Sequence, residues 1–418
     1  MNYIYSKVSS EKKFFGNSDP FQLIEKYGTP LYTYNENILR QRCRDLKGLI
    51  SYPNFTVNYS LKANSNLELI KIVRSEGLRA DAMSPGEIYL NKLAGYKPDE
   101  IFYISNNVSA DEFSYAINEG VKISVDSVSQ LEMFGKLNPG GKVSFRLNPG
   151  IGAGHHEKVT TAGQKTKFGI EMSSIPEVKR IIKEHKLKLI GINQHIGSLF
   201  MDSEAYLKST GNILSIARQF DDLEFVDLGG GFGIPYNKQS DQPRLDLNDL
   251  GGKLTKVINS WVKEYGKDIE FKIEPGRYIV AESSILLGKV NATKTNYNIK
   301  YIGTDLGFNV LIRPVMYDSH HDIEIYRKND IPSMKEETVN IVGNICETGD
   351  IIAKDRKLPE IIENDILGVL DSGAYGYSMS SNYNSRLRPA EVLIQADGNP
   401  KLIRRRDTFE DLVKNFII

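Results

Sequence analysis

The stretch FTVNYSLKANSNLELIKIVRSEG (residues 55–77) contains the pattern that decides the fold. Its first residues form an extended apolar run rich in β-branched and aromatic side chains, which predicts a strand. Lys62 follows this run, and small and amide residues separate it from a segment with apolar residues at helical spacing. The stretch therefore predicts one βα unit with a single lysine in its loop. Such a lysine is ordinarily a solvated surface charge, and the alternative is an amine held for chemistry.

The same βα unit recurs along the chain. Further strand candidates lie at 79–83, 101–105, 122–126, 142–148, 189–196, 223–230 and 271–276, with amphipathic stretches between them. This alternation predicts a parallel sheet covered by helices. A doubly wound sheet is one alternative, but the number and regularity of the units favour a closed (β/α)8 barrel of the TIM type. LYTYN (31–35) is interpreted as a lead-in strand of that barrel.

The pattern changes near residue 280. From SILLGKVNATKTNYNIKYIGTD (284–305) onward, strand-like runs are joined by turns, and few stretches have helical periodicity. This predicts a mostly antiparallel β domain. We therefore expect a cofactor-binding barrel over 31–284 and a β domain over 285–418. Residues 1–30 are assigned to the β domain, with a cap on the barrel as the alternative.

Composition excludes several classes of function. The 418 residues include 53 Lys+Arg and 53 Asp+Glu, and a net charge of zero does not favour a nucleic-acid partner. No apolar run reaches the ~18–20 residues that span a membrane, and the start lacks the order of a secretion signal. Cys43 and Cys346 are too few and too distant to suggest a disulfide framework. We expect a cytoplasmic globular protein without nucleic-acid or membrane partners.

Unusual residues concentrate at the predicted strand ends, where a barrel builds its active site. They are Lys62, Arg146, Asn148, His195, Ser198, the glycine run 229–231 and EPGR (274–277). Each has an ordinary alternative: a solvated lysine, a core histidine, a glycine turn, or a turn with a salt bridge. It is their joint occurrence at strand ends that predicts a site.

Together these residues match the chemistry of a pyridoxal phosphate site. Successive glycines after a strand let backbone N–H groups approach a phosphate. Arg277 and Ser198 would add donors to the same anion. Glu274 would bond a ring nitrogen, His195 would stack on a flat ring, and the lysine of the opening stretch would form a Schiff base. The glycine spacing does not match the dinucleotide-binding fingerprint.

Several motifs resemble one known family. YSLKAN, HIGS, GGGFG and EPGR, in this order, resemble the alanine-racemase-like barrel family of pyridoxal-phosphate decarboxylases. Four longer motifs narrow the resemblance to the diaminopimelate decarboxylases: NPGIGAGHHEKVTTAGQKTKFGI (148–170), LIRPVMYDSHH (311–321), CETGD (346–350) and GAYGYSMSSNYNSRLRPAEVL (373–393). The resemblance covers almost the whole chain. It implies decarboxylation of meso-2,6-diaminopimelate to L-lysine with pyridoxal 5'-phosphate as cofactor.

The resemblance also implies roles toward the cofactor. Lys62 would bind it covalently, His195 would stack on its ring, and Glu274 would face the ring nitrogen. Asp81 would support the surroundings of the lysine, with a purely structural role as the alternative. Tyr375 would contact cofactor and substrate. The residues implied to hold the phosphate are Ser198, Gly230, Gly231, Gly276 and Arg277.

The substrate roles follow from the same resemblance. Arg277, Arg313 and Tyr317 would bind the distal carboxylate, since arginine can pair with it through two hydrogen bonds. Glu347 would bind the distal ammonium, and Cys346 would donate the proton that replaces the departing carboxylate. In the family the CETGD segment reaches the active site of the neighbouring subunit. The resemblance therefore implies a homodimer with shared active sites.

Alternatives remain open from the sequence. Decarboxylation of D-ornithine, D-lysine, carboxynorspermidine or a siderophore or antibiotic precursor is one, although Arg313 with Tyr317 favours a substrate with a distal carboxylate. Racemisation and a non-catalytic cofactor carrier are the others, and the CETGD segment argues against both. GHHEKVTTAG (154–163) is expected to be a lid or a surface loop, and no metal is predicted. His320 and His321 are expected to be structural.

Overall fold

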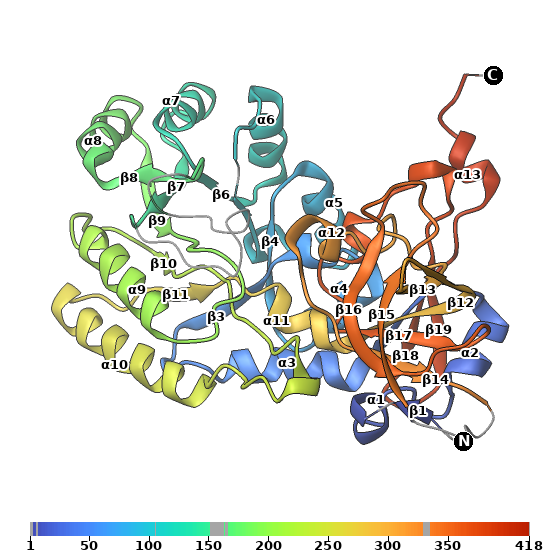
Figure 1. Cartoon of the computed structure of the whole chain (residues 1–418). Coiled ribbons are helices and arrows are strands. Elements are labelled where there is room, and N and C mark those ends of the chain that lie inside the picture. The colour runs from blue at the N-terminus through green and yellow to red at the C-terminus, as the bar shows by residue number, and fades with distance from the viewer. Residues whose placement is uncertain are drawn as a thin grey trace. The chain divides into compact units, whose positions relative to one another are not determined.

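The computed structural model describes residues 3–5, 7–104, 106–150, 163, 166–328 and 335–417. The chain forms two compact units, each with its own sheet (Figure 1). The barrel unit comprises Arg40–Ile234 and Arg244–Ile279, and the sheet unit comprises Met1–Leu39, Pro235–Pro243 and Val280–Ile418.

Eight parallel strands close into a ring in the barrel unit (Figure 1). Their order is β6, β5, β4, β3, β11, β10, β9 and β7, and β6 also pairs with β7. The predicted (β/α)8 barrel is confirmed, and each strand begins within two residues of its predicted position. The bounds are β3 Phe55–Tyr59, β4 Arg79–Ala82, β5 Ile101–Ile104, β6 Lys122–Val125, β7 Lys142–Asn148, β9 Lys188–Asn193, β10 Phe225–Asp227 and β11 Glu270–Ile273, with β8 (Ile170–Glu171) added beside β7.

Helices cover the outside of the ring (Figure 1). Four of them begin at a small polar residue, Asn66, Ser84, Ser109 or Ser127, whose side chain accepts a hydrogen bond from an N–H group of the first turn. These caps start each helix shortly after the preceding strand. The helices along this part of the chain are α3 Glu36–Lys47, α4 Leu67–Ser75, α5 Pro85–Leu93, α6 Ala110–Glu119, α7 Val128–Leu137, α8 Ile175–Glu184, α9 Glu204–Ala217, α10 Leu247–Tyr265 and α11 Arg277–Val280.

Aromatic rings fill the middle of the barrel. Phe102 of β5 and Phe225 of β10 come from opposite sides of the ring of strands, and their ring centroids are 5.2 Å apart. This contact can form only through the interior, so it identifies the inward face of each strand. The Lys272 ammonium lies 4.8 Å from the centre of the Phe225 ring. Because side chains alternate along a strand, Glu270 and Glu274 point inward with Lys272.

The sheet unit consists of mostly antiparallel strands, as predicted. β12 (Ser284–Asn296) is its longest strand and pairs with β2, β13 and β17. Two pairings are parallel, β13 with β15 and β2 with β18. The other bounds are β1 Tyr3–Tyr5, β2 Leu31–Asn35, β13 Ile299–Thr304, β14 Ile323–Tyr326, β15 Glu336–Val342, β16 Ile351–Pro359, β17 Ile366–Leu370, β18 Ala390–Ile394 and β19 Pro400–Arg404, with helices α1 Lys7–Glu11, α2 Pro20–Tyr27, α12 Arg313–Tyr317 and α13 Phe409–Val413.

Strand β2, the LYTYN segment, lies in the sheet unit rather than in the barrel. It pairs with β12 and β18, and its residues are all buried. Phe14, Phe15 and Leu23 pack in one core cluster with Leu31 and Ile285. The interpretation of this segment as a barrel strand is therefore corrected. A short apolar strand buried on both faces carries no signal of the strands with which it pairs.

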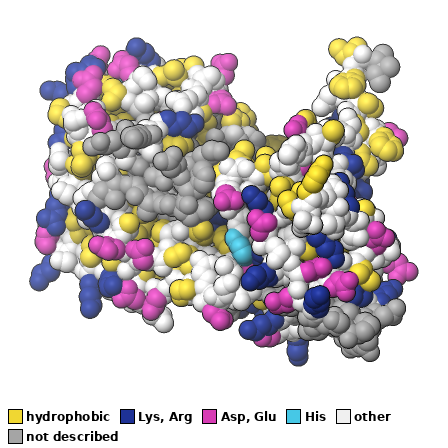
Figure 2. Space-filling model, viewed as in Figure 1, with side chains coloured by type: hydrophobic (Ala, Val, Ile, Leu, Met, Phe, Trp, Pro, Cys, Tyr) yellow, Lys and Arg dark blue, Asp and Glu magenta, His cyan; other side chains and the backbone are white. Residues whose placement is uncertain are grey.

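Charged side chains of both signs are interspersed over the face drawn in Figure 2. This mixture agrees with the equal numbers of basic and acidic residues. In the part of the chain that the structure describes, none of the helices combines the length and the apolar character needed to cross a membrane.

Candidate active site

Lys62 lies in a single 3-10 turn (61–63) directly after strand β3. Its two neighbours in the turn are buried, whereas the lysine itself is exposed. The charge of Lys62 acts on Asp81, His195 and Glu274, which come from three other strand ends of the barrel. The amine therefore stands among residues predicted to bind the cofactor.

Asp81 ties down the turn that carries Lys62. One of its carboxylate oxygens accepts a hydrogen bond from the Leu61 N–H at 3.0 Å, and the other accepts one from the Ser60 hydroxyl at 2.7 Å. Asp81 is fully buried, and this burial raises its pKa to about 7 against the opposing charge of Lys62. The supporting role of Asp81 stays a prediction, and these two bonds are its physical basis.

We expect Asp81→Asn to weaken the pH dependence of stability of the cofactor-free protein. A carboxyl whose pKa is raised on folding adds to the free energy of unfolding at low pH. This added stability is complete below about pH 4 and is lost as the pH rises through about 7. A shift of this size corresponds to roughly 4 kcal/mol at most. Urea unfolding at about pH 5 and about pH 8 measures the difference.

The exposed Asp111 of helix α6 supplies the control for this experiment. Asp111→Asn should keep the wild-type loss of stability toward higher pH. An equally steep loss in Asp81→Asn would contradict the assignment of the raised pKa to Asp81.

His195 is half-buried, and its imidazole is neutral. The Gly230 N–H donates to His195 Nδ1 at 3.1 Å, so the ring proton lies on Nε2. Burial, together with the charges of Lys62 and Arg146, lowers the pKa of His195 well below its usual value. A neutral imidazole can lie against a flat ring without bringing a charge. The Gly230 N–H is already engaged by His195. Gly230 matters instead because it allows the backbone of 230 to pack closely against that of Glu274: a Cβ atom at this position would lie 2.0 Å from the Glu274 carbonyl oxygen.

The remaining predicted phosphate-binding residues gather at the ends of β9, β10 and β11. Arg277 donates to the Ser198 hydroxyl from Nη2 at 2.8 Å and from Nε at 3.3 Å. A Cβ atom at Gly231 would lie 2.5 Å from the Gly197 carbonyl oxygen, and one at Gly276 would lie 2.9 Å from a side-chain atom of the Lys62 turn. Glycine is therefore required at both positions. A guanidinium and a hydroxyl beside closely approaching backbone suit an anion.

Glu274 follows strand β11 and is 5% exposed. No group among the described residues donates a hydrogen bond to its Oε1 atom. Burial, and then the charges of Asp227 and Asp81, raise the pKa of Glu274 well above its usual value. A buried carboxyl oxygen without a donor fits a protonated ring nitrogen, which would supply the missing hydrogen bond.

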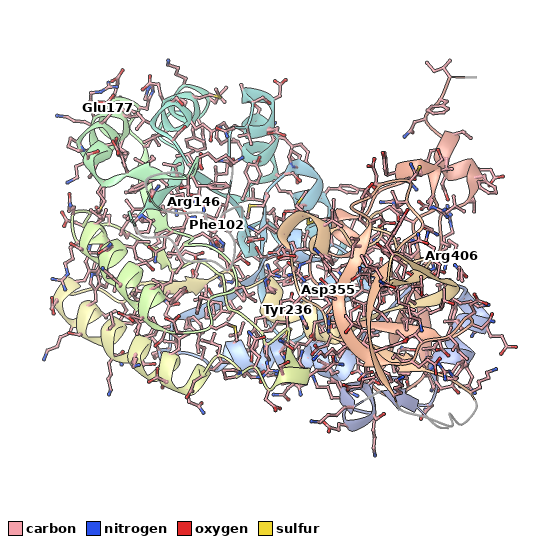
Figure 3. All side chains as sticks on the ribbon, viewed as in Figure 1. Phe102, Arg146, Glu177, Tyr236, Asp355 and Arg406 are labelled. Atoms are coloured by element: carbon pink, nitrogen blue, oxygen red, sulfur yellow. The ribbon has the colours of Figure 1, made fainter. Side chains whose placement is uncertain are left out.

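Arg146, Asp227 and Lys272 are charged residues of the barrel interior to which the sequence analysis assigns no individual role, although it names Arg146 among the strand-end residues. Arg146 of β7 is buried with its guanidinium 4.5 Å from the centre of the Phe168 ring, and Figure 3 labels it. Asp227 ends β10, and Lys272 lies beside it on β11. The sequence contains a signal for Asp227, which precedes the glycine run, and one for Lys272, which interrupts an apolar strand.

Arg313, a predicted substrate-binding residue, is buried in the sheet unit. Its Nη1 donates to His321 Nε2 at 2.7 Å, and its Nη2 donates to the Ser319 hydroxyl at 3.3 Å. The guanidinium lies 4.5 Å from the centre of the Tyr236 ring, which Figure 3 labels. His321 Nδ1 donates to the Leu370 carbonyl oxygen at 2.7 Å, so its Nε2 is free to accept from Arg313. His321 thus orients Arg313, in line with a structural part for this histidine.

Cys346 and Glu347 are exposed on a loop of the sheet unit. The Cys346 N–H donates to Asn384 Oδ1 at 2.7 Å, and the Tyr383 hydroxyl donates to Glu347 Oε1 at 2.6 Å. Asp350 closes the loop by accepting hydrogen bonds from two backbone N–H groups, at 2.7 and 2.6 Å. These bonds orient the loop and leave the thiol and the carboxylate toward solvent.

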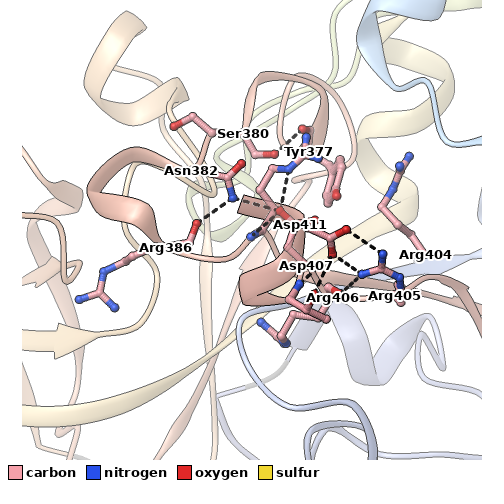
Figure 4. A network of polar contacts seen from close by, with 12 residues as sticks. Tyr377, Ser380, Asn382, Arg386, Arg404, Arg405, Arg406, Asp407 and Asp411 are labelled. Carbon is pink, nitrogen blue, oxygen red and sulfur yellow. Dashed lines mark hydrogen bonds and ion pairs between the residues drawn. The ribbon is translucent and has the colours of Figure 1, made fainter. Parts of the chain in front are cut away.

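Tyr317 and Tyr375 are half-buried in the sheet unit. Tyr317 ends helix α12, and Tyr375 has a left-handed backbone with φ of 57°, which a non-glycine residue adopts at a cost. Tyr375 lies near the start of the long 373–393 motif, and a polar network holds the later part of that motif (Figure 4). There Asn382 Nδ2 donates to Asp407 Oδ2 at 3.0 Å and to the Arg386 carbonyl oxygen at 2.9 Å.

The predicted site residues thus fall in two groups, one in each unit. The barrel unit brings together Lys62, Asp81, His195, Ser198, Gly230, Gly231, Glu274, Gly276 and Arg277. The sheet unit contains Arg313, Tyr317, Cys346, Glu347 and Tyr375. The GHHEKVTTAG loop lies outside the described residues except for Gly163, so its role and the predicted absence of a metal stay predictions.

Comparisons of this chain with family models, with curated proteins and with solved structures all point to one family. The family model for the pyridoxal binding domain of pyridoxal-dependent decarboxylases matches residues 37–281. The diaminopimelate decarboxylase of Methanothermobacter thermautotrophicus is 43% identical, over 96% of this chain and 94% of the relative. A crystal structure of a diaminopimelate decarboxylase is similar with a TM-score of 0.89 and 30% identity, over 99% of both chains.

A second solved structure carries a bound molecule. The diaminopimelate decarboxylase of Helicobacter pylori, complexed with L-lysine, is similar with a TM-score of 0.86 and 30% identity, over 95% of this chain and 98% of that one. The matched model covers more than half of the chain, and the relatives are matched along nearly their whole lengths. The chain therefore belongs to the diaminopimelate decarboxylase family of pyridoxal-dependent decarboxylases.

Proposed function

We propose that the protein binds pyridoxal 5'-phosphate at the C-terminal ends of its barrel strands and converts meso-2,6-diaminopimelate to L-lysine and carbon dioxide. The grouping of an exposed amine, a buried carboxyl, a neutral imidazole and a guanidinium–hydroxyl pair at these ends carries the proposal. The named activity of the relatives and the L-lysine in the Helicobacter pylori structure support the substrate and the product.

The barrel residues match the parts of the cofactor. Lys62 would bind its aldehyde carbon, Ser198 and Arg277 its phosphate, and the neutral ring of His195 one face of the pyridine. Glu274 would hold a proton on the ring nitrogen. When bound, the cofactor withdraws electrons from the carbon that loses carbon dioxide, and the protonated nitrogen strengthens this withdrawal.

The polar residues of the sheet unit match the distal end of the substrate. Arg313 and Tyr317, with Arg277, would bind the distal carboxylate, because a guanidinium can donate two parallel hydrogen bonds to it. The exposed carboxylate of Glu347, oriented by the Tyr383 hydroxyl, would bind the distal ammonium. Tyr375 would contact cofactor and substrate, as the family resemblance implies.

Cys346 would supply the proton that completes the reaction. The bond between the reacting carbon and its carboxylate breaks, carbon dioxide leaves, and the carbon takes the proton from the thiol. We propose that the Cys346 loop does this at the site of a neighbouring subunit, in a homodimer located in the cytoplasm. The thiol is exposed on the loop surface, and this exposure supports a role at the site of a neighbouring subunit.

The substrate is tested by carbon dioxide release from meso-diaminopimelate, D-lysine and D-ornithine. We expect rapid release from meso-diaminopimelate and a kcat/KM at least about 10-fold to 100-fold lower for the other two, which lack a distal carboxylate. Faster release from D-lysine or D-ornithine would assign the protein to a related decarboxylase instead.

Arg313→Met gives a matched test of the distal carboxylate. We expect it to lower kcat/KM for meso-diaminopimelate by about 10-fold to 100-fold, the range for a lost charge-assisted hydrogen bond. Activity on D-lysine, however low, should change little, because this substrate has no carboxylate at that end. An equal loss on both substrates would show that Arg313 acts on the fold rather than on the substrate.

A further inference from the structure

Two carboxyls, those of Asp227 and Glu274, lie together in the barrel interior. Asp227 is the last residue of β10 and is in register with Lys272 on β11. Lys272 points inward onto the Phe225 ring, and Glu274 points inward two residues later along the same strand. Asp227 therefore lies nearer to the N-terminal end of the barrel than Glu274, and Lys272 lies beside Asp227.

Both carboxyls are buried, and each has one oxygen to which no described group donates a hydrogen bond. Asp227 is 0% exposed and Glu274 is 5% exposed. Asp227 Oδ1 accepts a hydrogen bond from the Gly229 N–H at 2.8 Å. No N–H or hydroxyl group among the described residues donates to Asp227 Oδ2 or to Glu274 Oε1. A proton held between the two carboxyls would satisfy both oxygens.

The electrostatics agree with one proton on the pair. Burial raises the pKa of Asp227 to about 6, although the bonds from Gly229 and Glu274 and the charge of Lys272 oppose the shift. Burial and the neighbouring Asp227 raise the pKa of Glu274 well above its usual value. Two adjacent buried carboxyls resist ionising together, so one of them keeps a proton near neutral pH.

The charged and titratable groups around the pair come from several strands. Besides Asp227, the charges that act on Glu274 are those of Asp81, Lys62 and Arg146. The charges of Lys272 and Glu270 act on Asp227. The charges of both carboxyls also act on Tyr206, whose hydroxyl donates to the Gly229 carbonyl oxygen at 3.1 Å. Lys272 pairs with Glu270 at 2.8 Å and is 1% exposed, so its ammonium is fixed beside Asp227.

We propose that Asp227 and Glu274 share one proton in the cofactor-free protein and that they deliver it to the ring nitrogen of pyridoxal 5'-phosphate when the cofactor binds. The proton leaves the carboxyl pair and forms the N–H bond of the ring, and no other bond changes. Both carboxylates are then ionised, Glu274 beside the ring N–H and Asp227 beside Lys272. The total charge of this group is the same before and after, so a buried site can accept a neutral ring without taking a proton from water.

This inference deepens the proposed function, because it rests on the role of Glu274 toward the ring nitrogen. Asp227 is assigned as a positioning residue that acts through Glu274. Pyridoxine 5'-phosphate is a suitable probe, since it has the ring nitrogen and the phosphate but no aldehyde to react with Lys62. Titration calorimetry in buffers of different ionisation enthalpy counts the protons exchanged on binding.

Asp227→Asn should take up about one proton more than the wild type on binding the probe, whatever the protonation of the free probe. The variant has no stored proton, because the amide can donate to an ionised Glu274. Glu274→Gln is the matched control. This variant also lacks the stored proton, but it leaves no carboxylate to hold a proton on the ring nitrogen. The number of protons it exchanges should therefore equal that of the wild type, while its affinity for the probe falls. A proton count in Asp227→Asn equal to the wild type would overturn the proposal and leave Asp227 a purely structural role.

Infrared difference spectroscopy tests the unmodified protein, in case Asp227→Asn does not fold. We expect the carbonyl band of a protonated carboxyl to disappear when pyridoxine 5'-phosphate binds to the wild type. Binding with this band unchanged would overturn the stored proton but not the cofactor site. Failure to bind the probe at all would contradict the proposed function itself.

Discussion

Lys62→Ala should abolish the visible absorbance of lysine-bound cofactor and lower kcat by at least about a thousandfold. The reason is geometric as well as chemical. The amine projects from a turn that Asp81 holds through Leu61 and Ser60, and it stands among the residues predicted to bind the cofactor. Absorbance spectra of the purified variant with pyridoxal 5'-phosphate, and carbon dioxide release from meso-diaminopimelate, measure both effects.

Lys122→Ala is the matched control for this experiment. Burial, with the charge of Lys272, lowers the pKa of Lys122, which makes its amine more reactive than an ordinary surface lysine. However, Lys122 begins strand β6 and so lies at the opposite, N-terminal end of the barrel. The control should keep both the absorbance and the activity. Survival of the visible band in Lys62→Ala would mean that another lysine binds the cofactor.

Cys346→Ala should lower kcat for meso-diaminopimelate by about 10²–10⁴-fold, the usual range for loss of a positioned proton donor. The absorbance of the bound cofactor should stay, because Cys346 is not assigned to cofactor binding. Cys43→Ala is the control, since Cys43 is buried in helix α3 and burial raises the pKa of its thiol. Full activity of Cys346→Ala would assign the proton to another group.

Mixing the Lys62→Ala and Cys346→Ala proteins tests the shared active site. Neither protein alone should be active. If each site combines Lys62 of one subunit with Cys346 of its partner, a mixed dimer contains one intact site. Random exchange of subunits should then restore about a quarter of the wild-type activity. No recovery after proven subunit exchange would place both residues of a site in the same chain.

Much of the fold was predictable because local signals agree with one another. Most barrel strands are short runs rich in β-forming residues, and several are followed by a serine or asparagine that caps the next helix. Periodicity and capping are properties of neighbouring residues, so the sequence displays them directly. LYTYN was misplaced because its partners, β12 and β18, come about 250 and 360 residues later along the chain, and nothing local identifies them.

The candidate site shows the same division. Lys62, Glu274 and Arg277 stand out because each polar group follows a strand that is otherwise mainly apolar. The roles of Asp227 and His321 cannot be inferred from the sequence, since these roles depend on which side chain each residue meets. Asp227 meets Glu274 across neighbouring strands, and His321 accepts from Arg313 only because its other nitrogen donates to a distant carbonyl group.

The sequence by itself determined the order of strands and helices, the change to a β domain after the barrel, and the residue types that a pyridoxal phosphate enzyme needs. The tertiary structure alone decided the partners of β2, the tautomer of His195, the bonds by which Asp81 holds the Lys62 turn, and the pairing of Asp227 with Glu274. The physical reason is distance. Secondary structure follows from interactions within a few residues, whereas pKa values and tautomers follow from burial and from neighbours that only the closed barrel brings into contact.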